Sequence, residues 1–293
     1  MKKNVLITGA NGQLGYSLTL GLSDSFNIIP TAKRNFDNII KCDITDKKDL
    51  KNIFNRYNPD IIINCAAITN VDYCEKKWSE CRLVNTVGLE NIIRFSHKNT
   101  KIIQISTDYV YDGLNGPYLE TDATHPINLY GKSKLEAENI LIGSNRKYLI
   151  LRLNGLYTYD LSYNNFVSWI IGEIKNKNNI KVVSDQISNP VYVELITNVI
   201  LKSILMEAEG VFNYGSSNYL SRYDLALEIC SVFGFSSRFI DSITSKSLNQ
   251  IAKRPKNTSL ITEKIENRLG LQTYDTKYCL MDIKDKLVKK WKK

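Results

Sequence analysis

The stretch "NVLITGANGQLG", residues 4–15, decides the fold. It opens with a short apolar run typical of a buried strand, and Gly9, Gly12 and Gly15 follow where a helical pattern starts near Leu14. Glycine permits a tight turn and lets backbone N–H groups approach an anion at the positive end of a helix. Because the triad joins a strand to a helix, it predicts a pyrophosphate site rather than an ordinary turn.

Apolar runs and helical patterns alternate through the first half of the chain. This alternation predicts a doubly wound parallel α/β sheet, a Rossmann fold, with helices on both faces. After residue 157 the strands shorten and loops become more polar, which indicates a smaller C-terminal α/β lobe. We expect an NAD(P)-binding domain at 1–157 and a substrate-binding lobe at 158–293, with residues 193–215 returning to the main sheet. Strands are expected at 4–8, 26–31, 39–43, 60–67, 101–107 and 148–157, and helices at 47–57 and from about 74 to 97.

Composition favours a globular protein of the cytoplasm. The 293 residues are 43% hydrophobic and 24% charged, and no run approaches the ~20 apolar residues of a membrane-spanning helix. The first apolar run breaks at Gly9, too early for a signal peptide. We therefore expect a cytoplasmic location and no membrane insertion.

Cysteines, histidines and net charge do not indicate a metal or a nucleic acid. The six cysteines form no CxxC pair and there are two histidines, so free thiols are expected and no metal site is predicted. Much of the net charge of +9 lies in "KDKLVKKWKK" at 284–293, which is typical of a solvated helix end. A positive surface would equally suit a phosphate-bearing substrate.

The segment "TAKRNFD", residues 31–37, bears on the cofactor. An acidic residue closing the second strand would bind the ribose 2′-hydroxyl of NADH. Here Lys33 and Arg34 stand near that position, and Asp37 comes later. Cationic side chains favour the 2′-phosphate of NADPH, so we expect NADPH over NADH, unless the two side chains belong to a solvated loop.

Tyr130 and Lys134 are four residues apart in a predicted helix and share one face. A nearby ammonium favours the tyrosinate and would lower the pKa of the hydroxyl from about 10, which suits acid–base work. The same spacing occurs at Tyr73 and Lys77 among surface-like charges. This second pair serves as an internal control.

The segment "ISTDYVYDG", residues 105–113, ends an apolar strand in polar groups. Ligands of open α/β sheets bind at the carboxyl ends of the strands, where the glycine turn also lies. We therefore expect Thr107, Asp108 and Tyr109 at the site, with the Thr107 hydroxyl positioning a substrate carbonyl for Tyr130. A packing role explains Tyr111 equally well.

These residues resemble the dTDP-4-dehydrorhamnose reductase family of the extended short-chain dehydrogenases. The resemblance rests on "TGANGQLG" (8–15), "NCAAITNVDYCE" (64–75), "ISTDYVYDG" (105–113), "PINLYGKSKLEAE" (126–138), "NNF" (164–166), "DQISNP" (185–190) and "RPKNTSL" (254–260). It implies reduction of the C4 ketone of a nucleotide-linked 4-keto-6-deoxyhexose, for deoxysugars of surface polysaccharide. Tyr130 would protonate the developing alkoxide, Lys134 would hold the nicotinamide ribose, and Thr107 would bond the carbonyl.

The resemblance also implies a wider set of binding residues and allows a homodimer. Asn85 would brace the site, and Gln186 and Arg254 would lie near the nucleotide or its diphosphate. The expected substrate residues are Thr69, Asp108, Tyr109, Gln186 and Arg254. The expected cofactor residues are Gly9, Asn11, Gly12, Gln13, Leu14, Gly15, Lys33, Arg34, Asp43, Ile44, Ala66, Ala67, Asn85, Tyr130 and Lys134.

Three departures from the family pattern stand out. Gly155 replaces an aromatic residue, "DQISNPV" lacks a glycine and a threonine, and the first helix reads Tyr16-Ser17-Leu18 without the glutamate linked to a magnesium-bridged dimer in some relatives. Two alternatives remain open: a non-catalytic NADP-binding regulatory subunit, as for methionine adenosyltransferase, and an epimerase or dehydratase of the same fold. Dehydratases usually carry Asp-Glu after the threonine, whereas this chain has Asp108-Tyr109.

Overall fold

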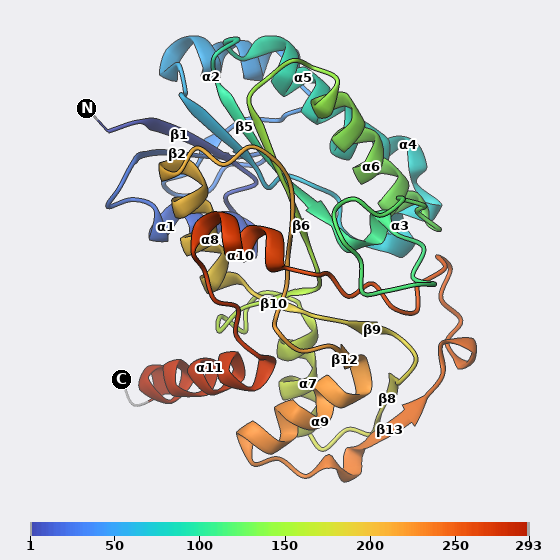
Figure 1. Cartoon of the computed structure of the whole chain (residues 1–293). Coiled ribbons are helices and arrows are strands. Elements are labelled where there is room, and N and C mark those ends of the chain that lie inside the picture. Colours follow the sequence, from blue (N-terminus) through green and yellow to red (C-terminus); the bar gives the residue numbers. More distant parts are fainter. Residues whose placement is uncertain (1, 292–293) are drawn as a thin grey trace.

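A computed structural model describes residues 2–291 of the chain. Seven parallel strands form its central sheet in the order β11-β6-β5-β4-β1-β2-β3 (Figure 1). The predicted doubly wound parallel sheet is confirmed. The strands are β1 (Asn4–Thr8), β2 (Asn27–Ala32), β3 (Ile40–Lys41), β4 (Ile61–Asn64), β5 (Lys101–Thr107), β6 (Tyr148–Leu153) and β11 (Gly210–Tyr214).

Helices cover both faces of this sheet because successive strand residues point to opposite sides. Val5 and Ile7 of β1 pack in one apolar core, and Leu6 packs in the other. The first core lies against α1 (Gln13–Gly21), α8 (Val193–Leu205) and α10 (Glu263–Leu269). The second lies against α2 (Lys47–Tyr57), α5 (Gly88–Phe95) and α6 (Leu129–Ile142).

The order in which strands are added to the sheet reverses at β1, which pairs with β2 on one side and β4 on the other. Such a switch point opens a crevice beyond the carboxyl ends of the strands. The glycine turn after β1, the loop after β4 and the residues after β5 all lie at this edge.

The helical region expected from about 74 to 97 is not continuous. It consists of α3 (Val71–Lys76), α4 (Trp78–Arg82), a π-helical turn (Leu83–Val87) and α5. The helix breaks at Lys77, whose φ and ψ are −130° and 53°. The π-helical turn carries Asn85, and such turns occur often at functional sites.

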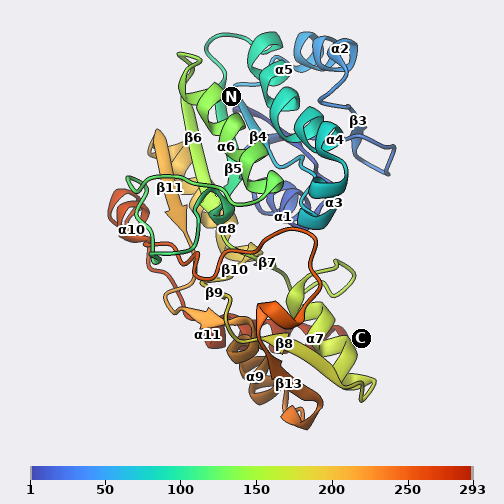
Figure 2. The ribbon, with the colours of Figure 1, turned by 90° about the vertical axis from the view of Figure 1, so that its right-hand side faces the viewer.

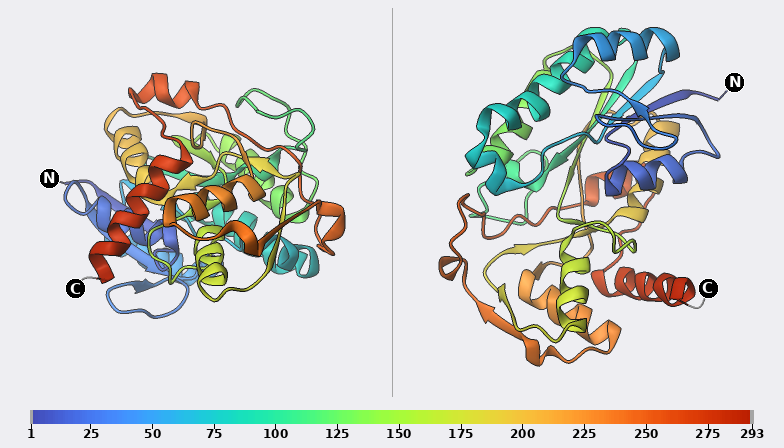
Figure 3. Two further views of the ribbon diagram at one scale, coloured as in Figure 1. Left: turned by 90° about the horizontal axis from the view of Figure 1, so that it is seen from below. Right: turned by 180° about the vertical axis from the view of Figure 1, so that it is seen from behind.

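A smaller lobe lies below the sheet in the view of Figure 1 and has its own apolar core. The lobe is also separate from the sheet when the molecule is seen at right angles and from behind, and α11 lies beside its other helices (Figures 2 and 3). Its helices are α7 (Phe166–Lys175), α9 (Arg222–Phe233) and α11 (Thr276–Trp291). Its short strand pairs are β7 (Leu156–Tyr157) with β10 (Val191–Tyr192), β8 (Ile180–Val183) with β13 (Ile240–Ile243), and β9 (Ile187–Ser188) with β12 (Leu220–Ser221).

Three elements from the second half of the chain pack on the main sheet. β11 pairs in parallel with β6, α8 packs against α1, and α10 packs against α8 and β11. None of the helices within residues 2–291 is long and apolar enough to cross a membrane.

Candidate active site

The glycine turn after β1 lies directly against the loop that follows β4. Gly9 has a φ of +64°, and a Cβ atom there would lie 2.8 Å from the backbone nitrogen of Ala66. A Cβ atom on Gly15 would overlap the carbonyl oxygen of Gly9. Because α1 begins at Gln13, its first N–H groups, which have no partner within a helix, face this turn. The turn therefore fits an anionic group such as a pyrophosphate.

A buried row of polar side chains crosses β1, β4 and β5. The Thr8 hydroxyl donates to Asn64 Oδ1 at 2.6 Å, and Asn64 Nδ2 donates to Gln104 Oε1 at 2.7 Å. Thr8 Oγ1 also accepts a hydrogen bond of 3.2 Å from the backbone N–H of Ala66. The row thereby holds the start of the loop after β4 against the glycine turn.

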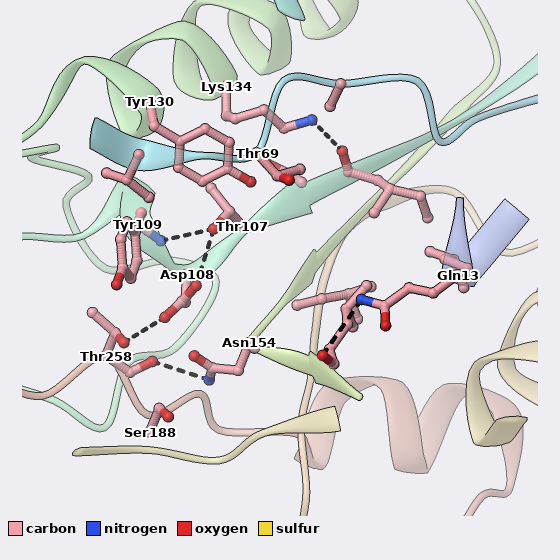
Figure 4. Close-up of a pocket in the computed structure, with 18 of the residues that line it drawn as sticks. Gln13, Thr69, Thr107, Asp108, Tyr109, Tyr130, Lys134, Asn154, Ser188 and Thr258 are labelled. Carbon is pink, nitrogen blue, oxygen red and sulfur yellow. Dashed lines mark hydrogen bonds between the residues drawn. The ribbon is translucent and has the colours of Figure 1, made fainter. Parts of the chain in front are cut away.

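Asp108 ties the end of β5 to the second half of the chain. Its two carboxylate oxygens accept hydrogen bonds from the hydroxyls of Thr107, at 3.0 Å, and Thr258 (Figure 4). Burial raises the pKa of Asp108 to about 6, although both hydroxyls and the charge of Arg222 oppose the rise. Asp108 thus fixes the position of the Thr107 hydroxyl.

Tyr130 extends from the first turn of α6 toward the same point. The helix is capped by Asn128, whose side chain accepts a hydrogen bond of 2.8 Å from the N–H of Gly131. The ring of Tyr130 meets that of Tyr109 edge to face, with centroids 6.1 Å apart. Its hydroxyl points toward Thr107 and Thr69 (Figure 4). Two or more hydroxyl groups therefore converge on one place.

The pKa of Tyr130 differs from the expectation. Burial raises it above its ordinary value, and the hydrogen bond to Thr107 only partly opposes this rise. Lys134 is not among the main groups that shift it, and its ammonium donates a hydrogen bond of 2.6 Å to the carbonyl oxygen of Ile105. Burial lowers the pKa of Lys134 itself to about 8, while Glu138 opposes that change. Tyr130 is therefore protonated at neutral pH, as a proton donor must be.

A cavity of about 400 Å³ joins the glycine turn to these groups. It extends from the main sheet to β9 and the start of α9 in the smaller lobe. The predicted residues that line it are Gly9, Gly12, Gln13, Leu14, Gly15, Ala67, Thr69, Thr107, Asp108, Tyr109, Tyr130, Lys134 and Gln186.

Comparison with known proteins identifies the family. The family model of the RmlD substrate binding domain matches residues 2–288. A dTDP-4-dehydrorhamnose reductase from Aggregatibacter actinomycetemcomitans is 34% identical, with 96% of this chain and 98% of the relative covered. The chain belongs to the RmlD family.

Solved structures of RmlD family members superpose over nearly the whole chain. A dTDP-4-dehydrorhamnose reductase from Bacillus anthracis, crystallised with NADP, has a TM-score of 0.91 at 31% identity and covers 98% of this chain and 100% of its own. Another from Clostridium acetobutylicum has a TM-score of 0.89 at 35% identity, with 97% and 99% covered.

Several of the predicted site residues do not line the cavity. Ile44 is buried in the core against α2 and α5. Lys33 forms an ion pair of 3.1 Å with Asp43 at the rim of the sheet. Hydrogen bonds from Thr45 and Lys33 lower the pKa of Asp43, although burial opposes them. The residues outside the cavity lining are Asn11, Lys33, Arg34, Asp43, Ile44, Ala66, Asn85 and Arg254.

Asn85 acts on the site from behind the cavity wall. Its side chain accepts from the N–H of Ile68 at 2.8 Å and donates to the carbonyl oxygen of Ile68 at 3.0 Å. It also donates to the hydroxyl of Ser133 at 3.0 Å. Asn85 therefore holds the loop after β4 against the helix of Tyr130 and makes no cavity contact itself.

Arg254 forms an ion pair and a hydrogen bond with other residues of the chain. Its guanidinium lies 3.0 Å from Asp72 Oδ1 and donates to the carbonyl oxygen of Ala252 at 3.0 Å. Its neighbour Pro255 lines the cavity instead.

Several cavity residues were not predicted from the sequence. Asn154 follows β6 at the same sheet edge. Ligands bind at the carboxyl ends of such strands, and this argument, which predicted Thr107, applies to Asn154 as well. Thr258 lies within the quoted segment 254–260, but its contact with Asp108 spans 150 residues of sequence. Arg222 begins a helix in the smaller lobe, and no local pattern marks it as a site residue. The missed residues that line the cavity include Asn154, Gly155, Ser188, Arg222 and Thr258.

The control pair behaves as a surface pair in this RmlD family member. Tyr73 is 37% exposed, and its hydroxyl donates to Glu80 at 2.5 Å. Lys77 stands at the break between α3 and α4. Tyrosine–lysine spacing alone therefore does not define the site.

Proposed function

We propose that this chain reduces the C4 ketone of a nucleotide-linked 4-keto-6-deoxyhexose with NADPH, and that dTDP-4-dehydrorhamnose is its first candidate substrate. The convergence of Tyr130 and Thr107 on one cavity with the glycine turn supports the chemistry most directly. The relatives named dTDP-4-dehydrorhamnose reductase support the substrate. NADP in the Bacillus anthracis relative supports the cofactor.

The residues of the cavity divide the work of such a reaction. When bound, the nicotinamide cofactor supplies the hydride. Thr107 would orient the ketone oxygen by turning its hydroxyl hydrogen from Asp108 to that oxygen, and Tyr130 transfers its proton to the oxygen as negative charge develops there. Lys134 contributes a buried positive charge on the same helix face, which favours the tyrosinate that remains.

The glycine turn would hold the pyrophosphate of the cofactor, with Gln13 and Leu14 beside it. Lys33 and Arg34 would meet the 2′-phosphate, which requires Lys33 to exchange its ion pair with Asp43 for the phosphate. Thr69 and Tyr109 would contact the sugar, and Gln186 the nucleotide.

We also propose a division between residues 1–157 for the cofactor and 158–293 for the substrate, with 193–215 in the main sheet. The pairing of β11 with β6 and the separate core of the smaller lobe support it. Location in the cytoplasm and assembly as a homodimer stay predictions.

Purified protein incubated with NADPH and 4-keto-6-deoxyhexoses carrying dTDP, UDP, GDP or CDP tests the proposal. We expect loss of reduced-nicotinamide absorbance, fastest with the dTDP sugar. An epimerase or dehydratase of this fold would consume no added NADPH. A regulatory subunit would bind NADPH without catalysing any reaction of the sugars. Either result would exclude the reductase.

A further inference from the structure

Arg222 brings a guanidinium group to the cavity wall opposite the main sheet. It is the first residue of α9, whose N-terminus is closed by a capping box between Ser221 and Asp224. Its backbone N–H donates to the carbonyl oxygen of Gln186 at 3.1 Å, and the preceding strand β12 pairs with β9. The base of the side chain is therefore held against other cavity residues.

The guanidinium itself lies between an aromatic ring and a glycine. Its central carbon is 5.2 Å from the centroid of the Phe166 ring. A Cβ atom on Gly155 would lie 3.5 Å from both terminal nitrogens, so Gly155 leaves the space that the guanidinium occupies. Arg222 also interacts with the side chain of Tyr109 and opposes the rise in the Tyr109 pKa that burial causes.

The charge of Arg222 has no ion-pair partner among the residues that the structure describes. Arg254, the arginine expected near the diphosphate, is instead paired with Asp72 and lies outside the cavity lining. Among the described cavity residues, Arg222 is the one arginine. The charge of Arg222 acts on Asp108, but none of the described carboxylates lies at ion-pair distance, and a planar guanidinium so placed suits the oxygens of a phosphate.

The contact with Tyr109, which Arg222 shares with Tyr130, indicates which phosphate this is. In a hexose the anomeric carbon lies across the ring from C4, so the phosphate on it stands one ring-width from the ketone. Tyr109, which Arg222 contacts, has its ring centroid 6.1 Å from that of Tyr130. Arg222 and Tyr130 thus both contact Tyr109, the proposed sugar contact, so the phosphate next to the sugar is the one nearest Arg222.

We propose that Arg222 binds the phosphate joined to the sugar and makes this site selective for nucleoside diphosphates, a role that rests on the proposed nucleotide-sugar substrate. Gly155 is part of the same arrangement, because a bulky side chain there would displace the guanidinium.

Binding of dTDP and dTMP to the full chain, measured by calorimetry, tests the proposal without turnover. We expect dTDP to bind more tightly than dTMP. Arg222→Gln should weaken dTDP roughly 10- to 100-fold, the range of a charged hydrogen bond, and change dTMP by less than about 2-fold. Arg222→Lys keeps the charge but loses the paired donors, so its dTDP affinity should lie between those of the parent and Arg222→Gln. This second variant also serves if Arg222→Gln does not fold.

Arg238→Gln is the matched control. Arg238 also stacks on a phenylalanine, 4.7 Å from the Phe239 centroid, but it does not line the cavity. Its dTDP affinity should equal that of the parent. If the keto-sugar panel identifies another nucleotide, its di- and monophosphates replace dTDP and dTMP.

Two results would overturn the assignment of Arg222. One is unchanged dTDP affinity in Arg222→Gln, with the loss appearing in Arg254→Gln instead. The other is a loss of affinity in Arg222→Gln that appears for UDP-glucuronate and not for UDP-glucose. That result would mean that Arg222 binds a carboxylate on the sugar. Absence of NADPH consumption by the parent protein would count against the proposed function and leave this binding test intact.

Discussion

Lys134 Nζ lies 2.6 Å from the carbonyl oxygen of Ile105 and joins the helix of Tyr130 to the strand that ends in Thr107. Burial lowers the pKa of Lys134 to about 8 and raises that of Tyr130. At neutral pH both groups therefore carry their protons. The hydrogen bond therefore ties together the two elements that carry Tyr130 and Thr107.

Tyr130→Phe removes the proposed proton donor and keeps the ring that packs against Tyr109. We expect turnover to fall at least ~100-fold, since general acid catalysis contributes ~10²–10⁴, while NADPH affinity changes little. Steady-state rates and fluorescence titration of NADPH measure the two effects. Tyr73→Phe, at the exposed control pair, should leave both unchanged. Near-normal turnover in Tyr130→Phe would refute the assignment.

Replacing Lys33 and Arg34 by alanine tests the choice of cofactor. Their charges would pair with the 2′-phosphate that NADPH has and NADH lacks, so KM should rise more for NADPH than for NADH. Initial rates with each cofactor give the comparison. Equal changes for both cofactors would show that the two residues belong to a solvated loop.

The pH dependence of the activity should follow the protonation of Lys134. Its ammonium is lost as pH rises through about 8, so kcat/KM for NADPH should decline above that pH. In Lys134→Arg the charge persists, because a guanidinium has a pKa above 12, and the decline should vanish even if the overall rate is lower. An unchanged alkaline limb in this variant would assign the titration to another group.

Glu138 and Arg152 form a buried ion pair of 2.7 Å behind the site, with side chains 1% and 5% exposed. Glu138→Gln leaves the guanidinium uncompensated, and we expect the free energy of unfolding to fall by ~3–5 kcal/mol. Urea denaturation measures the change.

Glu136→Gln provides the control on the same helix. Its partner is Arg82, and the two side chains are 30% and 48% exposed, so we expect a loss of ~0–1 kcal/mol. Similar losses in both variants would mean that burial does not set the strength of these pairs.

Local sequence determined the framework of this protein. The glycine turn, the strand ending at Thr107 and the helix at 47–57 could be predicted because side-chain period and backbone preference act over a few residues. The shared face of Tyr130 and Lys134 follows from helical spacing in the same way. The break at Lys77 could not be predicted from the apolar pattern of the helical region.

Tertiary structure decided which partners the polar side chains of the site contact. Arg254 pairs with Asp72 across 182 positions of the chain, Thr258 donates to Asp108 across 150, and Arg222 reaches the cavity from the smaller lobe. The same packing raises the pKa of Tyr130 where the lysine spacing alone predicted a decrease. A long polar side chain takes the partner that folding places within its reach, and burial adds a desolvation cost that no local pattern encodes.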